Sequence, residues 1–234
     1  MLTIAFDLDD TLYDRTQPLR KSLLHFEKTK DLSFENFYPI FEINREFAFE
    51  KVKERVWSLE ESYIYRIQET LRQLGIDISD KEALSFQEHY EYQQQHIELL
   101  PHIEDILAFL QREDIQTFII TNGPSNNQRN KIKNLGLENY FRKEQVIVSG
   151  EEGVAKPDVR IFEVAEKRFP LEKKQTWFIG DSYENDIVGA HHAGWNSIWL
   201  KHERNNESTL PQITPTKTFT NTKDLQEFIV ARFK

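Results

Sequence analysis

Carboxylate side chains follow a short apolar segment near the start of the chain. The segment from Leu2 to Leu8 is short and mostly apolar, which predicts a strand buried on both faces, and Asp7 and Asp9 stand at its carboxyl end. Side chains alternate along a strand, so the two carboxylates point the same way if the extended backbone continues. Like charges this close repel, and a divalent cation that prefers oxygen ligands, such as Mg²⁺, relieves the repulsion. The simpler explanation is that these acids end a strand in solvent.

Polar side chains also stand at or just after the ends of later apolar segments. They are Thr121, Asn122, Lys156, Asp181 and Asp186. In an open parallel sheet, ligands bind beyond the carboxyl ends of the strands, so these side chains are expected to meet. Carboxylates, a cation and a hydroxyl donor supply what phosphoryl transfer needs: a metal site, positive charge and a nucleophile. Taken singly, each residue has a structural explanation as a strand threonine, a surface lysine or a helix-capping aspartate.

Two patterns predict the elements that would position these residues. Strand-like segments alternate with helical ones after residue 100, without a hairpin signal, which predicts a parallel, doubly wound α/β sheet. Residues 16–96 instead show helical apolar spacing with a single glycine, which predicts four or five helices and no strand. The predicted domains are therefore 1–14 with 98–234, and an inserted all-helical domain at 15–97. The predicted strands are Leu2–Leu8, Gln116–Thr121, Gln145–Ser149, Thr176–Gly180 and Ser197–Leu200.

The last part of the chain predicts a loop and a helix. Residues 202–218 are polar and rich in proline and threonine, which is typical of a surface loop. Residues 224–233 are expected to form a terminal helix that packs on the core.

Composition narrows the class of protein. The 234 residues are 38% hydrophobic and 29% charged, with a net charge of -9, as in water-soluble globular proteins. No strongly basic segment is present, so binding to a nucleic-acid polymer is not expected. The absence of cysteine excludes disulfides, thiolate zinc sites and cysteine nucleophiles. No segment approaches the roughly 20 apolar residues of a membrane span, and Asp7 interrupts the first apolar run, so we expect a cytoplasmic protein without membrane association.

Four short motifs, taken together, resemble those of the haloacid dehalogenase superfamily, in its phosphatase branch. They occur in family order, each at a predicted strand end or in the following loop: Asp7-Leu8-Asp9-Asp10-Thr11-Leu12, Thr121-Asn122-Gly123, Lys156-Pro157-Asp158 and the run from Gly180 to Asp186. The resemblance covers the chain from Leu2 to about Leu200. It implies an α/β catalytic core with a helical cap at residues 15–97, whose closure would shield the site from water. The hinge would lie near 13–15 and 99–101.

The resemblance also implies a role for each matched residue. Asp7 would be the nucleophile that forms an aspartyl-phosphate, and Asp9 would protonate the leaving oxygen and then activate water. Lys156 would neutralise the Asp7 carboxylate and the phosphate. Mg²⁺ would be bound by Asp7, by the main-chain carbonyl of Asp9 and by Asp181.

Three further matched residues would support the phosphate and the metal. Thr121 and the Asn122 amide would hold phosphate oxygens. Asp186 would orient the waters of the magnesium ion or Lys156.

The substrate implied by the resemblance is a small phosphate ester. The residues around Thr121–Leu137, with Gln128 and Lys131, and the segment Ser149–Gly153 are similar to nucleotidase-like members, which hydrolyse nucleoside monophosphates, and to acylneuraminate phosphatases. Aromatic residues of the helical segment either stack on a base or pack the cap; they are Phe47, Trp57, Tyr63 and Tyr65.

Three alternatives remain open. A phosphomutase and a 2-haloacid dehalogenase share the fold, but the family's mutases usually carry glycine where Asp10 stands. Its dehalogenases use other residues at the position of Asp9, because they have no leaving oxygen to protonate. A non-catalytic binding module is disfavoured because no motif residue is missing. The sequence leaves the oligomeric state open.

Overall fold

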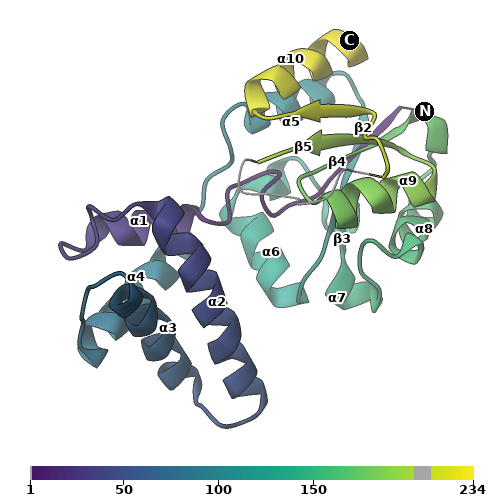
Figure 1. Ribbon diagram of the computed structural model, residues 1–234. Coiled ribbons are helices and arrows are strands. Elements are labelled where there is room, and N and C mark those ends of the chain that lie inside the picture. Colours follow the sequence, from purple (N-terminus) through teal and green to yellow (C-terminus); the bar gives the residue numbers. More distant parts are fainter. Residues whose placement is uncertain (1, 203–211) are drawn as a thin grey trace. The chain divides into compact units, whose positions relative to one another are not determined.

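The chain divides into two compact units. The computed structural model describes residues 2–202 and 212–234 (Figure 1). One unit comprises Met1–Arg15 and Glu98–Lys234, and the other comprises Thr16–Ile97. We call the first the α/β unit and the second the helical unit.

A parallel sheet of six strands forms the centre of the α/β unit, in the order β3-β2-β1-β4-β5-β6. The strands are β1 (Thr3–Phe6), β2 (Gln116–Thr121), β3 (Val146–Val148), β4 (Thr176–Gly180), β5 (Asn196–Leu200) and β6 (Lys217–Phe219). β1 lies between β2 and β4, and Phe6 pairs with Ile119 and Ile179 on its two sides. The carboxyl ends of β1, β2 and β4, which are far apart in sequence, therefore lie side by side. Asp7 is the first residue after β1.

Helices cover both faces of the sheet (Figure 1). The helices of this unit are α5 (Ile103–Arg112), α6 (Ser125–Asn134), α7 (Ser149–Glu152), α8 (Val159–Arg168), α9 (Gly189–Ala193) and α10 (Thr222–Phe233), with the π-helix η4 (Tyr183–Val188) and the 3₁₀ turns η1 (Leu137–Asn139), η2 (Lys143–Gln145) and η3 (Lys173–Gln175). Consecutive residues of a strand face opposite sides. Phe178 of β4 packs against Phe162 of α8, whereas Trp177 packs against Phe233 of α10. This arrangement confirms the predicted doubly wound α/β fold.

The prediction of a loop over residues 202–218 is wrong for its last two residues, 217 and 218. Lys217–Phe219 forms β6, which pairs in parallel with β5, so that Thr218 lies opposite Trp199. Lys217 and Thr218 are exposed, as is usual in an edge strand, and the segment carries no apolar run that would have predicted a strand. Residues 203–211 of the predicted loop lie outside the described residues.

Four helices and no strand are described in the helical unit. They are α1 (Gln17–His25), α2 (Phe34–Lys53), α3 (Leu59–Gln73) and α4 (Asp80–Gln95). Their shared core is aromatic and aliphatic, with Phe37, Phe41 and Ile67 fully or almost fully buried. Ser58 and Ser79 begin α3 and α4 with capping boxes, each exchanging hydrogen bonds with a glutamate three residues later. Within the described residues, no helix combines the length and the hydropathy of a membrane span.

The two segments that enter and leave the helical unit lie side by side where they belong to the α/β unit. The backbone N–H of Leu100 donates to the carbonyl of Leu12 at 2.9 Å, and Tyr13 forms an isolated bridge with Leu99. A hinge at these residues stays a prediction.

Candidate active site

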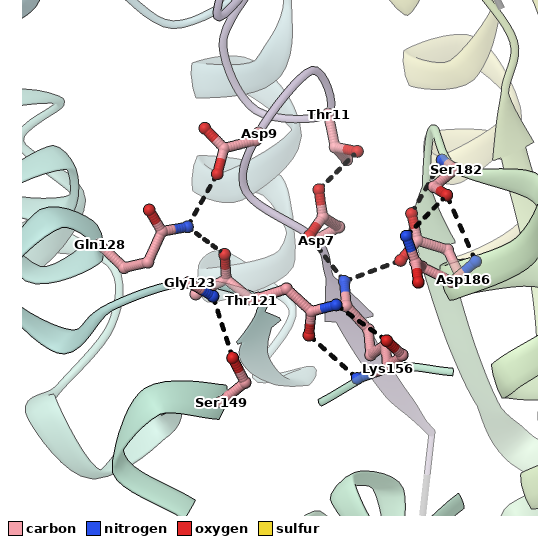
Figure 2. A network of polar contacts seen from close by, with 12 residues as sticks. Asp7, Asp9, Thr11, Thr121, Gly123, Gln128, Ser149, Lys156, Ser182 and Asp186 are labelled. Atoms are coloured by element: carbon pink, nitrogen blue, oxygen red, sulfur yellow. Dashed lines mark hydrogen bonds and ion pairs between the residues drawn. The ribbon is translucent and has the colours of Figure 1, made fainter. Parts of the chain in front are cut away.

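Asp7 lies where β1 ends, and the charged side chains of Lys156, from the loop between α7 and α8, and of Asp186, from η4, lie beside it (Figure 2). Its backbone N–H donates to the carbonyl of Ile179 at 2.9 Å, so the pairing of β1 with β4 continues up to this residue. Carboxylate oxygens of Asp7, Asp181 and Asp186 all lie within 4.8 Å of one another. Asp7 and Asp181 meet because β1 and β4 are neighbouring parallel strands whose carboxyl ends lie at one edge, and Asp186 comes from the helix that follows β4.

Lys156 links two of these carboxylates. Its Nζ donates to Oδ1 of Asp7 at 2.6 Å and to Oδ1 of Asp186 at 2.7 Å, and its side chain is 1% exposed. Burial alone would lower the pKa of Lys156, but the charges of Asp186 and Asp7 hold that pKa above its usual range. The lysine is therefore a permanently charged ammonium inside the site.

The balance of charge around Asp7 favours a bound cation. Burial raises the pKa of the Asp7 carboxyl well above its usual range; Lys156 opposes this rise, and Asp186 and Asp181 add to it. Three carboxylates facing one ammonium leave an excess of two negative charges when all are ionised. A divalent cation would balance that excess and favour the ionised form of Asp7.

The donor set fits Mg²⁺, which binds through a few carboxylates and retains several waters. Oδ2 of Asp7 has one hydrogen bond at 3.4 Å, from Thr11, and is available to a metal. Both oxygens of Asp186 are occupied at short distance, by Lys156 and by the backbone N–H of Ser182 at 2.9 Å. Asp186 is thus already engaged in holding Lys156, whereas Asp7 keeps an oxygen for a metal.

Two local features accompany the position of Asp186: a glycine at residue 180 and a π-helical segment. A Cβ on Gly180 would lie 2.3 Å from Oδ2 of Asp186, so only glycine leaves room for the carboxylate. Asp186 lies in the π-helix η4, in which the N–H groups of both Asp186 and Ile187 donate to the carbonyl of Ser182. A short π-helical segment of this kind is often found at functional sites.

Asp9 lies in a separate group of contacts on the side of α6. Its Oδ1 accepts from Nζ of Lys131 at 2.6 Å and from the hydroxyl of Tyr13, and its Oδ2 accepts from Nε2 of Gln128 at 2.8 Å. Burial raises the pKa of Asp9, but the charge of Lys131 and the hydrogen bonds from Lys131, Tyr13 and Gln128 outweigh burial and lower it. Asp9 is not among the carboxylates grouped around Asp7.

Thr121 and Asn122 connect these two groups of contacts. Thr121 is fully buried, and its hydroxyl oxygen accepts from the same Gln128 amide that binds Asp9 (Figure 2). The Asn122 side chain donates to the carbonyl of Lys156 and accepts from its backbone N–H, both at 2.9 Å. Asn122 therefore fixes the loop that carries the central lysine.

The predicted site residues thus lie at the carboxyl edge of the sheet, in two adjoining groups and in the segment that connects them. The sequence did not assign Tyr13, Gln128 or Lys131 to the surroundings of Asp9. The available signal was spacing: Tyr13 follows Asp9 by four residues, and Gln128 and Lys131 are three apart on one helix, which places them on one face. That pattern is too common on helices to predict a site by itself.

Comparison with known proteins gives the family. A model of haloacid dehalogenase-like hydrolases matches residues 4–200. This chain belongs to that family. As a haloacid dehalogenase-like hydrolase, it resembles a glyceraldehyde 3-phosphate phosphatase of Pyrococcus furiosus, with 28% identity over 201 residues that cover 85% of this chain and 80% of that protein.

Two further proteins similar to this haloacid dehalogenase-like hydrolase match different shares of its length. The pyrimidine 5'-nucleotidase YjjG of Escherichia coli is 34% identical over 113 residues, which cover 47% of this chain and 48% of that protein. The crystal structure of the HAD-hydrolase YfnB of Bacillus subtilis bound to magnesium has a TM-score of 0.64 at 24% identity, and the match covers 97% of this chain and 98% of that chain. The structural likeness shows a shared fold.

Proposed function

We propose that this haloacid dehalogenase-like hydrolase is a Mg²⁺-dependent phosphatase that hydrolyses a small phosphomonoester through an aspartyl-phosphate on Asp7. The observation that carries the proposal is the buried Asp7 carboxylate, 2.6 Å from the Lys156 ammonium and grouped with Asp181 and Asp186. A nucleophile, a fixed positive charge and a set of metal ligands at one strand end are the components of phosphoryl transfer. The phosphatase and the nucleotidase among the relatives support the same class of reaction.

The two chemical steps use Asp7 and Asp9 in turn. In the first, an Asp7 oxygen attacks phosphorus, the ester P–O bond breaks, and Asp9 gives a proton to the leaving oxygen. In the second, Asp9 takes a proton from a water molecule, which attacks phosphorus and releases Asp7 and phosphate. Thr121 and the Asn122 backbone amide hold phosphate oxygens, and Lys156 balances their charge. Bound by Asp7, the Asp9 carbonyl and Asp181, Mg²⁺ would supply further charge stabilisation.

The first substrate class to test is the nucleoside 5'-monophosphates. The support is the sequence similarity to nucleotidase-like members and to the pyrimidine 5'-nucleotidase of Escherichia coli. In this proposal the helical unit is the cap that selects the substrate, and the protein works in the cytoplasm on small molecules.

The alternatives have less support. A 2-haloacid dehalogenase is less well supported, because its carbon–halogen substrate has no leaving oxygen for Asp9 to protonate. Asp10 stands where the family's mutases usually have glycine. A binding module without catalysis has no need for a buried lysine between two buried carboxylates, since such an arrangement costs desolvation energy.

The test is an assay of the purified protein with p-nitrophenyl phosphate, with and without Mg²⁺, followed by a panel of phosphomonoesters ranked by kcat/KM. The panel includes nucleoside 5'-monophosphates, glyceraldehyde 3-phosphate and phosphoserine. We expect turnover that disappears with a chelator and in Asp7→Asn, while circular dichroism shows an intact fold. Turnover that persists in Asp7→Asn, or halide release from a 2-haloacid in place of phosphate release, contradicts the proposal.

A further inference from the structure

Three donors converge on the Asp9 carboxylate, and the catalytic scheme above assigns none of them a role. Lys131 and Gln128 come from α6, and Tyr13 comes from the turn that follows Asp9. All of these residues belong to the α/β unit, so their arrangement does not depend on the helical unit.

The two oxygens of Asp9 are held differently. Oδ1 accepts from both the Lys131 ammonium and the Tyr13 hydroxyl. Oδ2 accepts from Gln128, whose amide also donates to Thr121, one of the residues proposed to hold phosphate (Figure 2). Oδ2 therefore lies on the side of the phosphate site and keeps capacity for a further hydrogen bond, because a carboxylate oxygen has two lone pairs.

The Lys131–Asp9 pair is partly open to solvent. The side chains of Lys131 and Asp9 are 29% and 25% exposed, against 1% for both Lys156 and Asp186. Ion pairs with this much solvent contact contribute little to stability. The pair is thus better explained by the orientation it gives to the carboxylate than by stabilisation of the fold.

We propose that Lys131 is a positioning residue that fixes Oδ1 of Asp9 and thereby directs Oδ2 toward the leaving oxygen. The inference rests on the proposed phosphatase function. With Oδ1 held by Lys131 and Tyr13, Oδ2 carries the proton that passes to the leaving oxygen as the ester P–O bond breaks. The negative charge of the bound phosphate favours protonation of Asp9 and opposes the effect of Lys131. In the second step the same oxygen accepts the proton of the attacking water. Lys131 itself neither gives nor takes a proton.

The test compares leaving groups. The kcat/KM of a phosphatase with a covalent intermediate reports the steps up to release of the leaving group, so it includes the first proton transfer and not the second. p-Nitrophenolate leaves without help, whereas the less acidic phenol of phenyl phosphate needs protonation. We expect Lys131→Met to lower kcat/KM for phenyl phosphate about tenfold more than for p-nitrophenyl phosphate, and Lys131→Arg to restore much of the loss.

Two controls separate positioning from other roles. Lys133→Met removes an exposed lysine from the same helix and should change neither substrate. In an Asp9→Asn background, Lys131→Met should have no additional effect, because Lys131 acts through the Asp9 carboxylate. An equal loss for both substrates, or a full effect of Lys131→Met in the Asp9→Asn background, overturns the inference. If Asp9→Asn itself shows no dependence on the leaving group, the assigned role of Asp9 fails, and the proposed mechanism fails with it.

Discussion

The two units of the chain treat polar side chains in opposite ways. In the α/β unit, the ionisable side chains of Asp7, Lys156 and Asp186 are buried together beside the end of β1. In the helical unit, the most deeply buried polar side chains that the structure describes are neutral, such as Asn44 and Thr70, which bind each other at 3.0 Å. Arg66 is a partly buried cation there, and it donates to the neutral side chain of Gln87. Buried charge is expensive, so its concentration at one edge of the sheet indicates chemistry, whereas the polar groups of the helical unit serve its helices.

Among the variants considered, Lys156→Met is expected to have the largest effect on activity and stability. The substitution leaves the Asp7 and Asp186 carboxylates facing each other without their shared cation. We expect loss of activity to background and, without Mg²⁺, a loss of about 3–5 kcal/mol in the free energy of unfolding, measured by urea denaturation. A variant with wild-type activity and stability would show that the buried ammonium is not central to the site.

Gly180→Ala tests how closely Asp186 must approach the strand end. The new methyl group would lie 2.3 Å from Oδ2 of Asp186, so the carboxylate has to move and its contact with Lys156 is lost or lengthened. We expect kcat/KM for p-nitrophenyl phosphate to fall roughly 100-fold, since small displacements of positioned groups have effects of that order. Unchanged kinetics would mean that the position of Asp186 does not matter.

Ser79→Ala tests the opposite expectation for the helical unit. The Ser79 hydroxyl accepts from the backbone N–H of Glu82 at the start of α4. Its loss should lower the free energy of unfolding by about 1 kcal/mol and leave kcat/KM for p-nitrophenyl phosphate unchanged. Ser85→Ala, an exposed serine inside the same helix, is the matched control and should not destabilise. A large loss of activity in Ser79→Ala would contradict the expectation that polar groups of the helical unit stabilise its helices without affecting catalysis.

The smallest expected effect concerns an ion pair on the surface of the α/β unit. The hydrogen bond from Arg129, at 2.7 Å to Oε2, lowers the pKa of Glu151 to about 2 against the opposing effect of burial. Because the folded pKa lies below the unfolded value of about 4.3, the stabilisation is fully present above that value and is lost as the pH falls toward 2. Compared with Glu151→Gln, the wild type should be more stable at pH 7 by about 0.5 kcal/mol, after allowance for solvent exposure, and this difference should shrink below pH 4. A difference that is independent of pH would exclude the ion pair as its source.

Most of the sheet was predictable because its strands are apolar runs that end in polar motifs. β2 and β4 have the predicted bounds, and β1 is shorter than the predicted Leu2–Leu8. β6 was missed because an edge strand of exposed Lys217 and Thr218 has no apolar signal.

The site was predictable to the extent that motifs follow strand ends. Asp7, Lys156 and Asp181 could be grouped from the sequence, because a parallel sheet aligns its carboxyl ends. The surroundings of Asp9 could not be predicted, since they depend on how α6 turns Gln128 and Lys131 toward the first strand. The approach of Asp186 to Gly180 likewise involves a π-helical turn, which the residue pattern does not predict.

The central claim is that Asp7 carries the phosphoryl group during turnover. Its most direct test is mass spectrometry of peptides from Asp9→Asn, quenched in acid while it turns over p-nitrophenyl phosphate with Mg²⁺. This substrate needs no acid to leave, and without the Asp9 carboxylate the second step is slow, so the intermediate should accumulate. We predict a phosphoryl group on Asp7; phosphate release without any phosphorylated peptide, or a phosphoryl group on another residue, would contradict the account.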